Sequence, residues 1–313
     1  MSEPGPTFRC ADAARLRADP VAGSAPQADR WLLLEHPGPW PIDAVAGAGI
    51  DPAVLMDVQE AAGRAAGRIL LVRRPGRIDR MAARRWVVAG PSLGWVAGPW
   101  REDRDLRAAA EALLADPAQA PGVLETIMLV CAHGVHDACC AIRGRPVAAA
   151  LAAEWPGQVW ECSHVGGDRF APNVVVLPDG FYYGNLDAQS AVHTVRRHLA
   201  GSVEAGSLRG VARFPPPVQV AVAAAYGRLG PLAPNAVAVE SVTQLGPHHG
   251  HGSETTVDLR VAGAGRVLVE VLALRRPPAQ LTCRAGRETP ATEYRIESFE
   301  VLLPETVDKR QAE

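Results

Sequence analysis

Two stretches of the chain show the same succession of apolar runs, turn residues and amphipathic spacing. In the first stretch, a helix predicted from 52 to about 66 follows the first of four predicted strands, at 31–34, 68–72, 85–88 and 95–96. In the second, helices predicted over 141–155 and 187–199 accompany strands at 126–130, 158–160, 173–176 and 181–183. The shared order predicts two copies of one βαβ-plus-hairpin unit.

The two copies differ in chemistry. WLLLEHPG aligns with IMLVCAHG, and RILLVRRPG aligns with QVWECSHVGG. This overlay places Cys131, Cys162 and His164 where the first copy has glutamate, valine and arginine. Only the second copy can therefore carry a thiol-based site.

The pattern changes from residue 214 onward. A predicted helix starts at the three prolines 215–217 and ends near 230. The alternating runs that follow it predict a small antiparallel sheet with strands near 236–243, 255–261, 266–273 and 294–302. Between two of these runs, His248, His249 and His251 fit a solvated loop or an adventitious metal site. We expect an α/β chain in three parts, with boundaries at 1–110, 111–210 and 211–313.

Composition and charge narrow the class of protein. The chain has 313 residues, of which 48% are hydrophobic and 21% charged, which is typical of a globular protein with a large core. Its net charge of -2 provides no long-range field for nucleic acid or anionic lipid. No apolar stretch approaches about 18 residues, and the first residues, MSEPGPTFRC, lack an export signal. We expect a cytoplasmic protein with no nucleic-acid or membrane partner.

Cysteine supplies the first candidate chemistry. Four of the six cysteines lie within 32 residues, between Cys131 and Cys162. In a reducing compartment, clustered thiols indicate metal binding or redox chemistry more often than structural disulfides. Cys10 and Cys283 stand alone in the sequence, and we interpret both as small buried apolar residues.

The clustered cysteines fall in two blocks, CAHGVHDACC (131–140) and ECSHVGGDRF (161–170), each at the C-terminal end of a predicted strand. Loops at such strand ends gather functional groups in α/β sheets. Cys162 and His164 are two residues apart on an extended segment, so we expect them to share a face. Cys139 and Cys140 are adjacent at a helix start, so we expect only one of them to reach the centre. Asp168 is a substitute ligand.

Three cysteines and a histidine suit two kinds of metal centre. One is a tetrahedral structural zinc ion, and the other is a [2Fe–2S] cluster in which histidine replaces cysteine. Free or redox-active thiols are a third interpretation. The spacing alone does not separate these possibilities.

The two blocks resemble the sucrase/ferredoxin-like family, a group of thioredoxin-fold [2Fe–2S] proteins. The resemblance covers most of residues 1–210, and its most specific part is CSHVGGDRFAPNVVVLPDGFYYG. It implies two tandem thioredoxin-like units, of which only the second binds a cluster. It also implies as ligands the two cysteines of a C-x₈-C loop and the two histidines of an H-x-x-x-H motif. These positions fall on Cys131, Cys140, His164 and Asp168.

Asp168 departs from that pattern, so we expect Cys162 to be the fourth ligand, because thiolate is the stronger iron ligand and Cys162 shares a strand face with His164. Asp168 would then accept the His164 N–H or pair with Arg169. The predicted ligands are Cys131, Cys140, Cys162 and His164, with Cys139 and Asp168 as alternatives.

We expect an electron carrier rather than a stand-alone enzyme, whose redox donor and acceptor proteins the sequence does not identify. One alternative is a zinc-stabilised binding module with a Cys₃His site. The other is a thiol–disulfide redox protein that uses Cys139 and Cys140.

Overall fold

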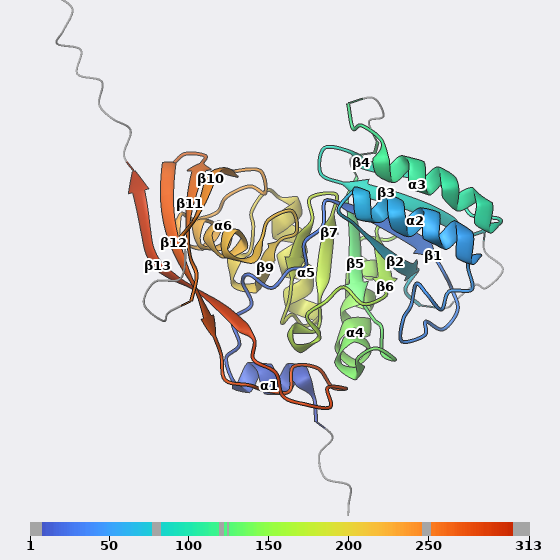
Figure 1. Ribbon diagram of the computed structural model, residues 1–313, viewed down its shortest axis with the longest axis horizontal. Coiled ribbons are helices and arrows are strands. Elements are labelled where there is room, and N and C mark those ends of the chain that lie inside the picture. Colours follow the sequence, from blue (N-terminus) through green and yellow to red (C-terminus); the bar gives the residue numbers. More distant parts are fainter. Residues whose placement is uncertain (1–7, 77–82, 119–121, 124, 246–251, 303–313) are drawn as a thin grey trace, which may run out of the picture.

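The computed structural model describes residues 8–76, 83–118, 122–123, 125–245 and 252–302. The candidate loop residues His248, His249 and His251 lie outside this described part. The described chain is a mixed α/β structure with a nine-stranded sheet and a four-stranded sheet (Figure 1). Within the described residues, no helix is long and apolar enough to cross a membrane.

The large sheet has the strand order β4-β3-β1-β2-β6-β5-β7-β8-β9. Its strands are β1 (Arg30–Glu35), β2 (Gly67–Arg73), β3 (Arg85–Gly90), β4 (Gly94–Pro99), β5 (Ile127–Cys131), β6 (Val159–Cys162), β7 (Val174–Leu177), β8 (Phe181–Tyr183) and β9 (Leu208–Val211). The eight strands predicted in the two stretches are confirmed. The sequence pattern did not predict the short strand β9.

The two halves of this sheet have the same internal order. β1 pairs parallel with β2 and antiparallel with β3, as β5 pairs parallel with β6 and antiparallel with β7. Glu35 pairs with Val72 at the end of the first pair, as Cys131 pairs with Cys162 at the end of the second. The register therefore supports the sequence overlay at the positions that decide the chemistry. The thioredoxin-like assignment of each half and the domain boundaries stay predictions.

Helices and the N-terminal segment cover the two faces of the large sheet. The helices are α1 (Cys10–Leu16), α2 (Pro52–Arg64), α3 (Leu106–Leu114), α4 (Ala138–Glu154), α5 (Ala188–Leu199) and α6 (Pro216–Arg228), with short 3₁₀ helices η1 (Asp103–Asp105), η2 (Asp168–Phe170) and η3 (Ala205–Ser207). Leu32 of β1 packs in a core with α2 and α3, and Val130 of β5 packs in another with α4 and α5. The next residues, Leu33 and Cys131, face a third core that includes α1. Strand alternation thus places Cys131 on the face covered by the N-terminal segment.

The four-stranded sheet is antiparallel, with strands β10 (Val237–Leu245), β11 (Glu254–Val261), β12 (Gly265–Arg275) and β13 (Thr292–Leu302). Helix α6 packs between this sheet and the large one (Figure 1), and Val218 of α6 shares a core with Val257 and Val269. The helix and sheet predicted after residue 214 are confirmed.

Helix α1 lies beside the segment that connects β12 to β13 (Figure 1). Arg276 donates a hydrogen bond to the Arg17 carbonyl oxygen at 3.0 Å. Asp19 is buried and forms ion pairs with Arg17 at 2.8 Å, Arg169 at 3.3 Å and Arg276 at 3.5 Å. These contacts hold the N-terminal segment and the β12–β13 connection against the loop that follows β6.

Candidate metal centre

Two buried cysteines meet where β5 ends and α4 begins. Cys131 is the last residue of β5, and Cys140 lies in the first turn of α4. Asp137 caps this helix by accepting a hydrogen bond from the Cys139 amide at 2.9 Å. Successive residues of an α-helix point about 100° apart. Cys140 therefore faces Cys131, and Cys139 faces a different set of side chains.

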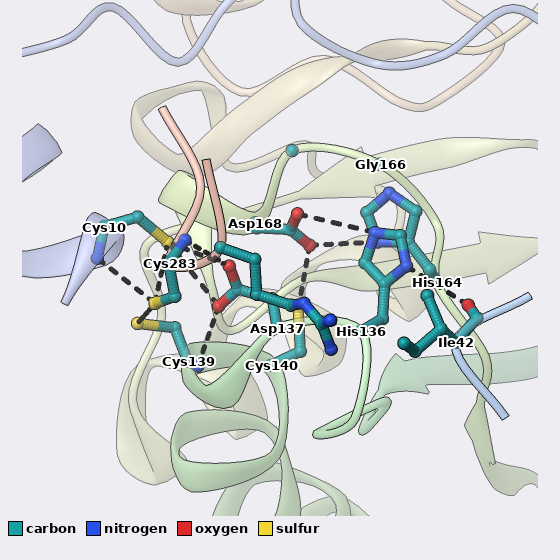
Figure 2. A network of polar contacts seen from close by, with 12 residues as sticks. Cys10, Ile42, His136, Asp137, Cys139, Cys140, His164, Gly166, Asp168 and Cys283 are labelled. Carbon is teal, nitrogen blue, oxygen red and sulfur yellow. Dashed lines mark hydrogen bonds and ion pairs between the residues drawn. The ribbon is translucent and has the colours of Figure 1, made fainter. Parts of the chain in front are cut away.

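The loop after β6 brings His164 and Asp168 to the same place. β5 and β6 are parallel, so their C-terminal ends meet at one edge of the sheet. The ligand atoms of Cys131, Cys140 and His164 all lie within 4.8 Å of one another. Asp168 Oδ1 lies 3.1 Å from Cys140 Sγ and 2.9 Å from His164 Nδ1 (Figure 2). We call Cys131, Cys140, His164 and Asp168 the central donor group.

The surroundings of the His164 Nδ1 atom indicate which kind of ligand the central donor group is suited to bind. This atom is buried and makes no hydrogen bond of acceptable angle, although Asp168 Oδ1 lies 2.9 Å away. A buried polar atom without a hydrogen bond costs about 1–3 kcal/mol. A nitrogen and an oxygen that lie this close without a hydrogen bond between them can both coordinate one metal ion. Because thiols, imidazole and carboxylate are also donors for zinc and iron, the residues present fit a metal centre.

The charges in the central donor group are coupled. A hydrogen bond with Cys140 holds the pKa of Cys131 well below its usual range; burial opposes this effect and His164 adds to it. The same hydrogen bond and burial raise the pKa of Cys140 well above its usual range. Burial alone would lower the pKa of His164, but contacts with Asp168 and Cys131 outweigh it and raise that pKa to about 9. The low pKa of Cys131 favours its thiolate, and a metal ion bound here would displace protons from the Cys140 thiol and the His164 imidazole.

A buried arginine fixes the loop between β6 and η2. Gly166 and Gly167 have φ values of 87° and 76°, which only glycine adopts without strain. The fully buried Arg209 donates hydrogen bonds to the Gly166 carbonyl oxygen at 2.8 Å and to Asn173 Oδ1 at 2.9 Å. Asn173 in turn donates to the Gly167 carbonyl oxygen at 2.9 Å. A Cβ atom at Gly167 would clash with the Arg209 guanidinium, so the loop and the arginine fit closely.

Cys162, the predicted fourth ligand, lies beside the central donor group and not in it. It pairs with Val72 of β2 and Cys131 of β5 and is fully buried, and this burial raises its pKa well above the usual range. Within the described residues, Cys162 belongs to no group of three or more close donors. β6 ends at Cys162, so the alternation that would put His164 on the same strand face does not extend that far. Asp168 instead approaches both Cys140 and His164, and the identity of the fourth ligand stays a prediction.

Asp168 was expected to contact His164 or to pair with Arg169. It approaches His164, but Arg169 pairs with Asp19 and not with Asp168.

His136 was not predicted as a site residue. Its ring stacks on that of His164 at a centroid distance of 3.8 Å, and its Nε2 atom lies 3.8 Å from Asp168 Oδ2. His136 lies inside the CAHGVHDACC block, and this position could have identified it as a candidate site residue.

The imidazole side of the site opens to the surface. A pocket of about 380 Å³ is lined by His133, His136 and His164, together with residues 42–45 from the loop after β1. The His164 side chain is 27% exposed, whereas Cys140 is fully buried. The thiols thus form the inner side of the centre and the imidazoles its outer side.

Neither a curated protein nor a solved structure matches the chain. A family does match it, over residues 21–210, a stretch that contains strands β1 to β8 and every member of the central donor group. On this match, the chain belongs to the sucrase/ferredoxin-like family.

Proposed function

We propose that the central donor group holds a [2Fe–2S] cluster and that the protein transfers single electrons. The arrangement of the donors carries this proposal. Close donors form two overlapping groups that share His164, one with Cys131 and Cys140 and the other with His136 and Asp168. Donors spread over two such groups suit a centre with more than one metal ion better than a single ion. Membership of a ferredoxin-like family supports the same assignment.

In this proposal, the two sides of the site have different tasks. Cys131 and Cys140 hold the inner iron in a buried environment, and His164 and Asp168 hold the outer iron. When bound, the cluster supplies a one-electron oxidation and reduction step. His164 and the stacked His136 line the surface pocket, so this pocket is where a redox partner approaches the centre most closely.

The ligand types set the expected order of reduction potentials. A neutral imidazole in place of a thiolate makes the cluster less negative, which raises its potential above that of all-cysteine ferredoxins. A carboxylate in place of a second imidazole adds negative charge. The potential should therefore lie below that of a cluster with two cysteine and two histidine ligands.

The anaerobically purified protein is expected to be coloured and to contain about two irons and two sulfides per chain. Chemical reduction should bleach the visible absorption and give an EPR signal from one unpaired electron. Iron, sulfide and zinc analysis together with the two spectra would measure this. Colourless protein that contains zinc and no iron, prepared from iron-replete cells, would contradict the proposal.

The fourth ligand is tested by comparing Asp168 with Cys162. Asp168→Ala should lower the iron content by about ten-fold or more, because a metal ligand is lost. Asp168→His should retain the cluster and raise its potential, because a neutral ligand replaces a carboxylate. Cys162→Ala is the matched control and should retain the visible spectrum. A normal cluster in Asp168→Ala and its loss in Cys162→Ala would return the fourth ligand to Cys162.

A single zinc ion at the central donor group is the second candidate. The short distances of 3.1 Å from Cys140 Sγ to Asp168 Oδ1 and 2.9 Å from His164 Nδ1 to the same oxygen favour it. Zinc does not absorb visible light, so the colour test separates the two metals. The placement of Cys139 and Cys140 in different groups gives no support to a thiol–disulfide function for that pair.

A further inference from the structure

A second group of metal-binding side chains lies on the other side of the α4 start. It consists of Cys10 from α1, Asp137 and Cys139 from the start of α4, and Cys283 from the connection between β12 and β13. One ligand atom from each lies within 4.8 Å of the others. Figure 2 shows these side chains converging, although 273 residues separate Cys10 from Cys283.

We propose that Cys10, Asp137, Cys139 and Cys283 bind one structural zinc ion. This site is separate from the central donor group and does not depend on the proposed cluster. The two groups draw on adjacent residues, because Cys139 belongs to one and Cys140 to the other.

The distances between donor atoms fit a tetrahedral ion. Cys283 Sγ lies 3.4 Å from Cys139 Sγ and 3.5 Å from Cys10 Sγ, and Cys10 Sγ lies 3.5 Å from Asp137 Oδ2. Zinc–sulfur bonds of about 2.3 Å at tetrahedral angles place two sulfurs about 3.8 Å apart. The observed separations are close to this value. They are too long for a disulfide bond, which is about 2.05 Å.

The buried carboxylate of the group is suited to a cation. Asp137 is fully buried and, in the part of the chain that the structure describes, forms no ion pair with an arginine or histidine. Its two carboxylate oxygens accept hydrogen bonds from the amides of Cys139 at 2.9 Å and Cys283 at 2.7 Å, which orient the carboxylate within the group. Three thiols packed around it can ionise only if positive charge is supplied. A divalent metal ion supplies that charge.

The donor types select the metal and its role. Thiolates are soft ligands that favour zinc and exclude calcium and magnesium, which prefer oxygen. Three sulfurs and one oxygen complete a tetrahedral shell with no open position, which is typical of structural and not catalytic zinc. The Cys10 amide also points to Cys283 Sγ at 3.5 Å, a contact that supports a metal-bound thiolate.

Zinc at this position would join three distant segments at the helix that carries Cys140. Neighbouring contacts hold the same segments together: Arg284 donates to the Val135 carbonyl oxygen at 2.8 Å, and Arg276 donates to the Arg17 carbonyl oxygen at 3.0 Å. The ion would thus fasten the N-terminal helix and the β12–β13 connection onto the start of α4.

Metal analysis of the full-length protein, purified anaerobically from cells grown with iron and zinc, tests the proposal. The wild type should contain about one zinc in addition to iron. Cys283→Ser and Cys10→Ser should lose this zinc and keep the iron. Cys162→Ser, which changes a buried thiol outside the group, should keep the zinc. Wild-type protein without zinc, or Cys283→Ser with full zinc, would overturn the proposal.

Two further measurements separate the zinc proposal from the cluster proposal and from general loss of folding. His164→Ala should lose iron and keep one zinc. The zinc content therefore tests this proposal even if the cluster assignment fails. Cobalt substituted for zinc should give sulfur-to-cobalt charge-transfer absorption in the wild type and lose it in Cys283→Ser, a variant of a partly exposed residue. A Cys139–Cys283 disulfide, detected as two missing thiols after denaturation without reductant, would overturn the proposal, as would iron in place of zinc.

Discussion

Cys140→Ser is expected to lower the iron content of the central donor group by about ten-fold or more, because a metal ligand is lost. The neighbouring change, Cys139→Ser, should instead retain the visible spectrum and lose the zinc. The reason is the direction of the two side chains. Cys140 Sγ lies 3.1 Å from Asp168 Oδ1, and Cys139 Sγ lies 3.4 Å from Cys283 Sγ. Iron and zinc analysis of both variants, with their visible spectra, measures the effect.

This pair of variants is its own matched control, because both change one buried thiol to a hydroxyl in the same helical turn. General damage to the start of α4 would affect both variants alike. Iron retained in Cys140→Ser and lost in Cys139→Ser would reverse the assignment of the two cysteines.

Arg209→Met is expected to lower the free energy of unfolding by about 3 kcal/mol, because hydrogen bonds from a buried charged group are lost and their acceptors remain buried. Burial lowers the pKa of Arg209 to about 10, so the side chain is still charged at neutral pH. Its partners include the Gly166 carbonyl oxygen, Asn173 and Ser24. The iron content should fall too, because the loop that carries His164 and Asp168 loses its anchor.

Urea denaturation of the holoprotein would measure the loss of stability as a lower midpoint. Arg213→Met makes the same chemical change at an exposed position and should alter the stability by less than about 0.5 kcal/mol. Equal midpoints for the two variants would show that Arg209 does not hold the loop.

Local patterns predicted most of the fold, and together with the family resemblance they predicted three members of the central donor group. Apolar runs and turn residues located the strands, and parallel β5 and β6 then had to bring Cys131 and His164 to one edge of the sheet. The predicted helix start limited the choice to Cys139 or Cys140, and the family resemblance selected Cys140. Strand positions are local properties of the sequence, and the meeting of Cys131 and His164 is a direct consequence of strand order. Both can therefore be predicted from a single sequence.

Two features of the site depend on information that the local sequence lacks. The choice between Cys162 and Asp168 depends on where β6 stops, and strand ends vary by a residue or two without changing the pattern. Cys10 and Cys283 looked like isolated apolar residues because their contacts cross almost the whole chain. The ion pairs of Asp19 with Arg17, Arg169 and Arg276 help to bring those segments together, and no spacing rule predicts them.

The antiparallel pairing of β2 with β6 has a consequence for assembly. An isolated β5–β6 unit would leave β6 as an open edge, to which a second molecule could add a strand. Here the first half of the same chain occupies that edge: Val72 pairs with Cys162, and Arg73 forms an ion pair with Glu161 at 2.7 Å. The two halves of the large sheet thus meet edge to edge, and the half that carries no member of the central donor group closes the β6 edge of the half that carries all four.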